Sequence, residues 1–590
     1  MKSQKCINWD IIFFIFLLLA VGSTRGYSQK RVSVSSLPYD SLHHLVTKHA
    51  MVSSEHLLSS EIGKEIMEKG GNAVDAAVAT AFAVSVSAPA LSGLGGGGCM
   101  LIWLKDQKKV IYIDFYAAKR VSAYKSIGSN KEGHKLWEVG IPGEVAGLLY
   151  AEDKYGKLSR EEVMGPAIKL ARDGFPMYPF FAHLIESGRD NLEQYDGKNL
   201  LFPNEETFPI GKIFKQEKLA ETLQMVADKG ASVFYNGSVG KDIVKVLNEG
   251  GIPVTMKDFQ DYRIDTDKAP LTTTYKKWKV FTPPPPQGGL EIIEDLNILD
   301  SFNMKETGLP TQSAHAFHIL TGAMRAGIAD RVYNVDPNWA RIPSEILTSK
   351  EYARERTKYA LQTPTPYSIK PGQLDLNVSS NKLKVNNKDV SLKEVKVDDG
   401  KKDGRGYTTS LSVVDADGNA VALTQTLSWI FGGNGVWVDG FFLNNSGVDF
   451  SQPIPDPYTL PEPTGDYRRP GSTIAPTIIL NKDNTVKLVI GSPGGNLIPT
   501  RIVQNIVYIL DYGMDPIVAA RMPRIYPLSA TNGVHTEEGF NGKVYEKERE
   551  NGYDFYINFG SHAEIYSIVR RDGYWIGAAD PLVEGGVAGY

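Results

Sequence analysis

An abrupt change of pattern near residue 408 constrains the fold of this chain more than any other feature. Residues 374–406 are rich in Lys, Asp, Asn, Ser and Gly, a composition typical of a mobile, solvated segment. Directly after it, Thr408–Val414 and Ala420–Thr426 predict two strands joined through the turn dipeptide Asp417-Gly418. The sequence therefore predicts a segment that can be cut without loss of the core, followed at once by a β-hairpin.

Other elements follow from the spacing of apolar residues. Residues 59–69 predict a helix that stops at Gly70-Gly71, and residues 73–86 predict a second helix that is apolar on nearly every side and so buried. Glycines within 93–98 match the spacing of a dinucleotide fingerprint, but a helix precedes them and a strand follows, so they favour a tight connection instead. Between 144 and 356 the pattern is mostly helical. The further predicted strands are 99–104, 110–115, 435–442, 477–480 and 486–490.

Composition excludes several classes of protein. The 590 residues contain 64 Lys and Arg against 68 Asp and Glu, a formal charge of −4, so there is no basic excess to hold a nucleic acid. Hydrophobic residues make up 42% and charged residues 22%, which is ordinary globular composition rather than that of a disordered chain. Most of the chain is expected to fold.

The N-terminus has the features of a secretory signal peptide. A basic start precedes an apolar run over residues 11–21, and small residues then frame a cleavage site after Ser28, with Gly26 as the competing position. The run is too short for an ordinary transmembrane helix of about 20 residues, so we expect a mature protein without a membrane segment, periplasmic or secreted. Signal removal takes Cys6 away and leaves Cys99 with no intramolecular partner.

The junction at 407–408 also fits one kind of chemistry. A threonine freed at its own amino group is nucleophile and base at once, because its hydroxyl attacks while its α-amine accepts the proton. The reference pKa of such an amine, about 7.7 to 8.0, suits a general base near neutral pH. This chemistry needs a Thr, Ser or Cys at the start of a strand directly after a flexible segment, and Tyr407-Thr408-Thr409 meets that requirement.

The stretch from Thr408 to Asp415, with Asp417-Gly418-Asn419 following, closely resembles the processing site of the γ-glutamyltranspeptidases. Other stretches resemble motifs of that family in its order, namely 70–77, 92–98, Asn444-Asn445, Asp449-Phe450-Ser451 and 491–495. The likeness runs from about Met51 to the C-terminus. It implies an N-terminal-nucleophile hydrolase with an α+β, four-layer αββα sandwich, made as a precursor that cuts itself before Thr408. It implies neither a cofactor nor a metal ion.

The resemblance assigns the reacting groups. Thr408 matches the nucleophile and Thr426 the hydroxyl that supports it. Gly494 and Gly495 match the backbone donors of the oxyanion hole, where glycine allows close approach of the N–H groups. The implied products of self-cleavage are a large subunit, 29–407, whose end 374–407 is the mobile segment, and a small catalytic subunit, 408–590, which stay together.

Three further positions match the part of the family's site that holds the substrate. Asp449 matches the carboxylate that binds the substrate's α-amino group, and Ser472-Thr473 match a Ser-Ser pair that positions the γ-glutamyl carboxylate. A carboxylate facing an ammonium, and hydroxyls facing a carboxylate, are the expected complements.

Three positions depart from the family's pattern. Tyr116 stands where the family has an arginine that clamps the substrate's α-carboxylate, Ser428 replaces an asparagine, and Ser446 replaces a Gln or Glu. A phenol cannot replace a bidentate cation. Either another cation restores the clamp or the acyl group is not an ordinary γ-glutamyl. The nearest candidate cations in the sequence are Arg468, Arg469 and Arg120.

Three functions remain open at this stage. The first is a γ-glutamyltranspeptidase that cleaves γ-glutamyl amides such as glutathione and passes the acyl group to water, an amino acid or a peptide. The second is a related amide acylase with another acyl donor, of the glutaryl or cephalosporin type, which Tyr116 favours. The third is an uncleaved binding protein, against which the intact Thr408, Thr426, Gly494 and Gly495 argue.

Overall fold

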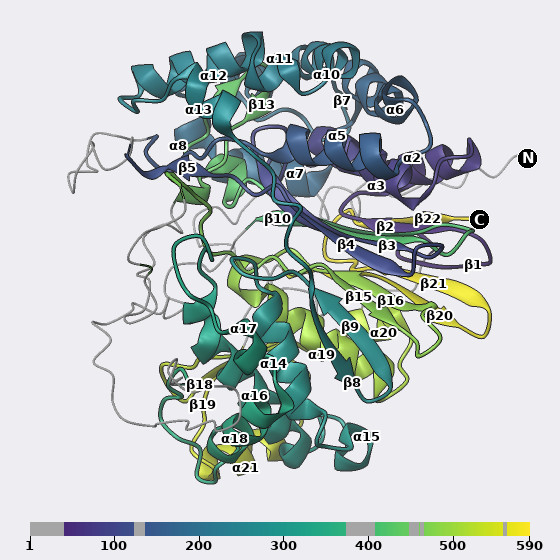
Figure 1. Cartoon of the computed structure of the whole chain (residues 1–590), viewed down its shortest axis with the longest axis vertical. Helices are drawn as coiled ribbons and strands as arrows, with labels where there is room; N and C mark the ends of the chain where they lie inside the picture. Colours follow the sequence, from purple (N-terminus) through teal and green to yellow (C-terminus); the bar gives the residue numbers. More distant parts are fainter. Residues whose placement is uncertain (1–40, 123–135, 373–406, 448–459, 461–464, 558–562) are drawn as a thin grey trace, which may run out of the picture.

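The computed structural model describes residues 41–122, 136–372, 407–447, 460, 465–557 and 563–590. The predicted signal peptide, the polar segment 374–406 and Asp449 lie outside these ranges. Two antiparallel sheets form the centre of the molecule (Figure 1).

The first sheet has six strands and carries the predicted hairpin. Its strands, in spatial order, are β22 (Gly586–Gly589), β2 (Met51–Ser54), β10 (Thr408–Val414), β11 (Ala420–Thr426), β3 (Gly97–Leu104) and β4 (Lys109–Asp114). Every residue of β10, β11 and β3 is buried, because the sheet is covered on both faces. The hairpin is therefore central in the sheet, and its bounds confirm the prediction from sequence.

The second sheet has seven strands and packs face to face on the first. In spatial order they are β1 (His44–Thr47), β21 (Tyr574–Ala579), β20 (Tyr566–Arg571), β16 (Val486–Gly491), β15 (Thr477–Leu480), β9 (Trp278–Thr282) and β8 (Leu271–Tyr275). The two sheets approach closely at Ser412, whose hydroxyl donates to the Tyr566 carbonyl across the interface at 3.0 Å. At Gly491 a side chain would collide with the Ser410 hydroxyl. Small residues thus allow the sheets to meet beside the start of β10.

Helices cover the outer face of each sheet. On the six-stranded sheet lie α2 (Leu57–Glu68), α3 (Ala73–Ser87) and α5 (Glu144–Tyr155), with α6 (Arg160–Asp173) packed on α3. On the seven-stranded sheet lie α14 (Gly289–Leu299) and α19 (Ile498–Leu510), with α16 (Ala314–Asp330) packed on α14. Figure 1 shows the resulting order of helices, sheet, sheet and helices, which confirms the four-layer αββα expectation.

The remaining elements are short or peripheral. The helices are α7 (Pro179–Ser187), α8 (Arg189–Leu192), α9 (Lys198–Leu201), α10 (Glu217–Lys229), α11 (Ser232–Tyr235), α12 (Ser238–Glu249), α13 (Met256–Asp261), α15 (Met304–Thr307), α17 (Ser344–Leu347), α18 (Lys350–Ala360), α20 (Pro516–Ala520) and α21 (Gly542–Glu550). The strands are β5 (Lys119–Arg120), β6 (Phe175–Pro176), β7 (Ile213–Phe214), β12 (Trp437–Val438), β13 (Phe441–Phe442), β14 (Tyr467–Arg468), β17 (Ile525–Pro527), β18 (Gly533–Thr536) and β19 (Asp554–Ile557). The 3₁₀ turns are η2 (Pro203–Glu205), η3 (Arg331–Tyr333), η4 (Ile430–Gly432) and η6 (Gly495–Leu497). Among the described helices, none combines the length and the apolar character needed to cross a bilayer.

Two expectations from sequence need correction. The single strand expected at 435–442 is wrong, because Asp439 and Gly440 both have a positive φ, of 49° and 93°, and turn the chain between β12 and β13. Within the mostly helical region, sequence reasoning missed the β8–β9 hairpin, which forms one edge of the seven-stranded sheet. Its strands have five residues each, and buried or half-buried positions alternate with more exposed ones along both.

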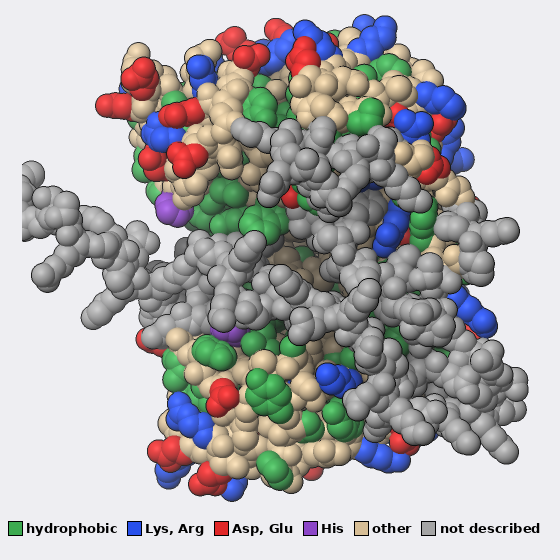
Figure 2. Space-filling view, turned by 90° about the vertical axis from the view of Figure 1, so that its left-hand side faces the viewer, with side chains coloured by type: hydrophobic (Ala, Val, Ile, Leu, Met, Phe, Trp, Pro, Cys, Tyr) green, Lys and Arg blue, Asp and Glu red, His purple; other side chains and the backbone are tan. Residues whose placement is uncertain are grey.

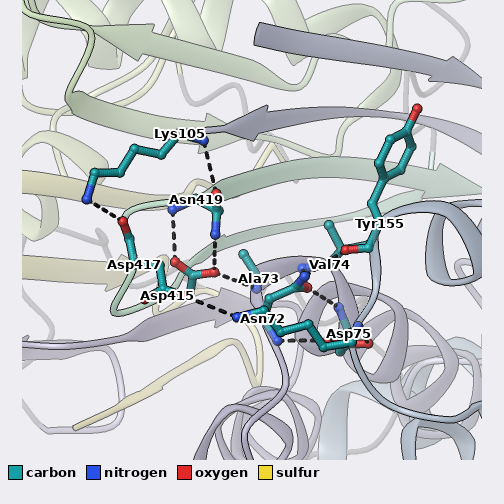
Figure 3. A network of polar contacts seen from close by, with 10 residues as sticks. Asn72, Ala73, Val74, Asp75, Lys105, Tyr155, Asp415, Asp417 and Asn419 are labelled. Carbon is teal, nitrogen blue, oxygen red and sulfur yellow. Dashed lines mark hydrogen bonds and ion pairs between the residues drawn. The ribbon is translucent and has the colours of Figure 1, made fainter. Parts of the chain in front are cut away.

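The end of the β10–β11 hairpin is joined to the start of α3 by a polar network (Figure 3). Asn72 caps α3, with its side chain accepting from two amides, and the Asp75 carboxylate accepts from the Asn72 amide in return. Asp415, at the end of β10, accepts from the Ala73 amide at 3.0 Å and from both nitrogens of Asn419 at 2.8 Å. These motif residues are thus structural, because they fix the hairpin against the buried helix.

Both sheets combine strands from either side of residue 408. In the six-stranded sheet β10 pairs with β2 on one side, and β11 pairs with β3 on the other. In the seven-stranded sheet β15 pairs with β9. The two predicted subunits therefore interleave in each sheet.

On the face in Figure 2, acidic and basic side chains are interspersed over both ends of the described surface, in keeping with the near-neutral charge.

Candidate active site

The two threonines of the predicted nucleophile pair face each other across the hairpin. Thr408 and Thr426 are register partners in β10 and β11, and their hydroxyl oxygens are 3.0 Å apart. Both are buried, with 4% and 1% of their surface exposed. Thr426 Oγ1 donates to the Tyr407 carbonyl at 2.9 Å and accepts the Ser428 amide at 2.7 Å.

These contacts define the direction of the hydrogen bond between the two hydroxyls. A threonine hydroxyl has a single proton, and that of Thr426 goes to the Tyr407 carbonyl. Thr408 is therefore the donor to Thr426, and its oxygen lone pairs remain available beside its own peptide bond to Tyr407. The hydrogen bond from Thr426 also polarises the Tyr407 carbonyl, which the Thr408 hydroxyl would attack in a cut before Thr408.

The two glycines proposed for the oxyanion hole lie in a loop that leaves β16. Gly491, the last residue of that strand, contacts Ser410, two residues from Thr408. Gly494 and Gly495 have φ values of 116° and 56°, in the region that strongly favours glycine. The loop then continues through η6 into α19. The orientation of the Gly494 and Gly495 N–H groups toward Thr408 stays a prediction.

Ser472 and Thr473 lie against this loop. The Thr473 hydroxyl donates to the Gly495 carbonyl at 2.8 Å, so it has a partner within the protein. The Ser472 amide donates to the Pro286 carbonyl at 2.8 Å, in the rigid proline-rich loop before α14. Their role toward a substrate carboxylate stays a prediction, as does that of Asp449, which lies outside the described residues.

The three positions that depart from the family's pattern come together in space. The Tyr116 phenol oxygen is 3.2 Å from Ser428 Oγ, which is 2.8 Å from Ser446 Oγ. Ser428 is also the residue whose amide binds Thr426. A connected group of neutral hydroxyls thus stands next to the nucleophile pair, where the resemblance implies a cation and two amide or carboxyl side chains.

Each of the three arginines considered as a replacement clamp contacts another protein group. Arg469 Nε is 3.5 Å from Asp114 Oδ1, and the guanidinium lies 5.8 Å from the Tyr262 ring centroid. Arg120 pairs with a buried aspartate of α13 at 2.6 Å, and Arg468 lies over a tryptophan ring. Of the three, Arg469 is the one linked to Tyr116 through a shared partner, because its neighbour Asp114 also accepts from the Tyr116 amide at 2.9 Å.

Sequence reasoning missed two cations near the site. Lys119 is almost fully buried, donates to the Trp137 carbonyl, and lies so close to Gly447 that a side chain there would collide with it. Arg331 donates to the Asn496 carbonyl at 2.6 Å, directly after the two glycines of the proposed oxyanion hole. No spacing rule identifies such residues, because their contacts join segments far apart in the chain.

Cys99 has no role in this chemistry. It is buried in β3, and burial raises the pKa of its thiol well above the usual value, with the Asp114 charge adding to the effect. The thiol is therefore protonated near neutral pH and shielded from reaction.

Comparison with known proteins gives a consistent result. The family model described as Gamma-glutamyltranspeptidase matches residues 59–590. The "Glutathione hydrolase proenzyme" of Escherichia coli (strain K12) is 33% identical, over 93% of each chain, and that of Bacillus subtilis (strain 168) is 32% identical, over 99% of this chain and 98% of the relative.

Solved structures agree in fold. A cephalosporin acylase from Bacillus halodurans superposes with a TM-score of 0.79 at 24% identity, over 96% of this chain and 99% of that one. A gamma-glutamyltranspeptidase from Helicobacter pylori superposes with a TM-score of 0.51 at 30% identity, over 58% of this chain and all of that one.

Proposed function

Since the chain belongs to the gamma-glutamyltranspeptidase family, we propose that it is an N-terminal threonine enzyme that cleaves γ-glutamyl amides such as glutathione. The acyl group passes to water, an amino acid or a peptide. Relatives named glutathione hydrolase, similar over nearly their whole length, support this activity. The geometric observation that carries the mechanism is the chain of contacts from Thr408 through Thr426 to the Tyr407 carbonyl.

Maturation starts from these contacts. The Thr408 oxygen bonds to the Tyr407 carbonyl carbon, the peptide C–N bond breaks, and the Thr408 nitrogen takes up the hydroxyl proton as it becomes a free amine. Water then hydrolyses the resulting ester, which leaves a Tyr407 carboxylate and a free Thr408 hydroxyl. Thr426 assists by donating to the carbonyl oxygen, where negative charge develops.

Turnover reuses the same hydroxyl. The free Thr408 amine accepts the hydroxyl proton while the oxygen attacks the side-chain amide of the donor. The Gly494 and Gly495 amides donate to the oxyanion, and the departing amine takes the proton. Water or an acceptor amine then attacks the ester and releases Thr408. No step calls for a cofactor.

A second candidate function rests on the cluster of three hydroxyls formed by Tyr116, Ser428 and Ser446. Because Tyr116, Ser428 and Ser446 bond to one another, the acyl donor meets neutral oxygens where a clamp for an α-carboxylate is expected. The second candidate is therefore an amide acylase whose donor is not an ordinary γ-glutamyl compound, such as a glutaryl amide, which keeps the carboxylate but lacks the α-amino group.

One comparison separates the two candidates. We expect purified, matured protein to release aniline from a γ-glutamyl anilide, and the matched glutaryl anilide has the same chain without the α-amino group. Preference for the γ-glutamyl compound supports the first candidate, and preference for the glutaryl compound supports the second. A single uncut chain on a denaturing gel, with no turnover of either, would contradict both.

Export is part of the proposal. Residues 1–28 carry the pattern of a signal peptide, and we expect the exported large subunit to begin just after Ser28 or Gly26. N-terminal sequencing of protein recovered from outside the cytoplasm checks this, and a large subunit that begins at Met1 would contradict it.

A further inference from the structure

We propose that Arg331, held by Glu291, is a positioning residue that aims the Gly495 amide into the oxyanion hole. The inference rests on the role proposed above for Gly495. Arg331 begins η3 directly after α16, and Glu291 lies in α14, so the pair belongs to the helices behind the seven-stranded sheet (Figure 1). Nothing in their sequence spacing relates them to Gly495.

The guanidinium of Arg331 is held by three partners. It binds Glu291 through two parallel contacts, Nε to Oε2 and Nη2 to Oε1, the latter at 2.9 Å. Nη2 also donates to the Asn496 carbonyl at 2.6 Å, and Nη1 donates to the Tyr526 hydroxyl at 3.4 Å. The Glu291 side chain is 1% exposed and that of Arg331 16%. A planar guanidinium clamped on a buried carboxylate has a fixed direction, so the carbonyl that it binds is fixed as well.

The carbonyl of Asn496 transmits this position to Gly495 through two peptide groups. In a trans peptide the N–H of the next residue points away from the carbonyl oxygen, so the Leu497 N–H points away from Arg331. That N–H donates to the Gly494 carbonyl at 3.1 Å. The Gly494 carbonyl belongs to the same peptide as the Gly495 N–H, which therefore points the opposite way, out of the turn.

Within the part of the chain that the structure describes, the neighbouring carbonyls of this loop accept from neutral groups. The Gly495 carbonyl accepts from the Thr473 hydroxyl at 2.8 Å, and the Pro493 carbonyl accepts from the Ser492 hydroxyl at 2.7 Å. Two glycines in succession have little intrinsic preference for one backbone conformation, so external contacts must select it. Among these contacts, Arg331 supplies the one from a charged donor, and charge-assisted hydrogen bonds are about twice as strong as neutral ones.

A plain structural role is the alternative, and the chain offers a matched control. Arg356, in α18, is 4% exposed and pairs with Glu294 of α14 at 3.2 Å and with Asp330 of α16 at 3.4 Å. It also donates to the Ala326 carbonyl at 3.0 Å. Arg356 thus stabilises the same helices as Arg331, but among the described residues it binds none of the 492–497 loop.

The test compares Arg331→Lys with Arg356→Lys in the full, matured protein, with rates expressed per cut Thr408 terminus. For Arg331→Lys we expect kcat to fall about 10- to 100-fold, less than the 10²- to 10³-fold typical of losing an oxyanion donor outright, because the donor remains but is poorly aimed. KM should change less than about threefold, because ground-state binding does not use the oxyanion hole. Arg356→Lys should lower thermal stability and leave both constants within about threefold of wild type.

Several outcomes would overturn the inference. These are a kcat for Arg331→Lys within threefold of wild type, an equal fall of kcat in both variants, or a rise in KM that accounts for the loss. Where Arg331→Lys does not fold, Glu291→Gln keeps the cation and loosens its clamp; we expect a 3- to 10-fold fall in kcat, and no change would again overturn the inference. Wild-type protein that cuts itself but turns over no donor would instead contradict the proposed function.

Discussion

In the proposed mechanism Thr408 serves two reactions with one oxygen, so a single substitution should stop both. We expect Thr408→Ala to remain one uncut chain with no turnover, because the attacking hydroxyl is lost and the Thr426 hydroxyl that remains only donates to the Tyr407 carbonyl oxygen. Thr408→Ser, the matched control, keeps the hydroxyl and should still be cut. A denaturing gel reads the result, and the small subunit of wild type should begin Thr-Thr-Ser-Leu-Ser. Normal cutting of Thr408→Ala would place the nucleophile elsewhere.

Tyr116 is the position at which binding of the acyl group can be tested. If no cation binds the α-carboxylate, Tyr116→Arg should lower KM for a γ-glutamyl anilide about ten- to hundredfold, the value of a charged hydrogen bond of about 1.5 to 3 kcal/mol. Tyr116→Phe is the control, since it keeps the ring and removes the hydroxyl that contacts Ser428. The measurement is KM for the anilide and for its analogue without the carboxylate. A strong preference of wild type for the carboxylate-bearing donor would contradict the missing clamp.

For single residues, the sequence predicts contacts between positions that lie close together along the chain. Facing positions for Thr408 and Thr426 follow from two strands and a short turn at Gly418, so their contact was within reach of sequence reasoning. The contact of Arg331 with Asn496 joins residues 165 positions apart, and no local pattern encodes it. The same holds for Tyr116 and Ser446, which come from separate segments and meet only at Ser428.

Among the elements, the β10–β11 hairpin depends on the polar network at its turn. Asp415 holds the N-terminus of α3 and both nitrogens of Asn419 (Figure 3). We expect Asp415→Ala to lower the free energy of unfolding by about 1.5 to 3 kcal/mol, the value of hydrogen bonds to a buried charge. Turnover per cut terminus should stay unchanged, because the network lies at the far end of β10 from Thr408.

The control is Asp417→Ala in the same turn. Its carboxylate is 67% exposed and pairs with Lys157 at 3.1 Å, so its loss should cost no more than about 1 kcal/mol. Urea unfolding of the two variants checks the difference. Equal losses would show that burial of Asp415 contributes nothing.

Helix α2 should make stability depend on pH. Its N-cap, His56, accepts the Leu58 amide on a ring nitrogen, and burial lowers the pKa of that ring to about 4. The unfolded chain takes up the proton near pH 6.5, so between pH 6.5 and 4 it binds more protons than the folded protein, and stability falls as pH drops through this window. The full loss is about 3 kcal/mol.

His56→Asn is the variant that isolates this effect. Asparagine keeps a capping oxygen but does not titrate, so its stability should change less than that of wild type between pH 6.5 and 4. Urea unfolding at several pH values gives both curves. Parallel curves would mean that His56 is protonated in the folded protein.

Prediction of elements succeeded where a long pattern was present and failed where strands were short. The buried helix α3 and the strands β10, β11, β15 and β16 were predicted to within one residue at each end. The β8–β9 hairpin was missed because its polar face gives no apolar run. Positive φ angles at Asp439 and Gly440 divide the strand expected at 435–442, because this Asp-Gly pair forms the turn between β12 and β13.

For the whole molecule, the mixing of strands in both sheets predicts how the cut protein unfolds. Because β9 and β15 pair across the two subunits, as do β2 and β10, neither subunit keeps a complete sheet alone. We expect urea to unfold both subunits in one transition, with a midpoint that rises with protein concentration, since unfolding releases two chains. The uncut Thr408→Ala chain should show no such dependence. Stepwise release of a folded subunit would contradict the interleaved arrangement.

This interleaving also gives the enzyme a finite working life. The strands find one another while they belong to a single polymer, and the proposed cut before Thr408 removes that link permanently. An unfolded pair must later meet as separate molecules, each with exposed sheet edges that invite aggregation. The lifetime of the active protein is therefore governed by the height of its unfolding barrier rather than by an equilibrium between native and denatured forms. Activity lost to heat should be restored by new synthesis and not by cooling.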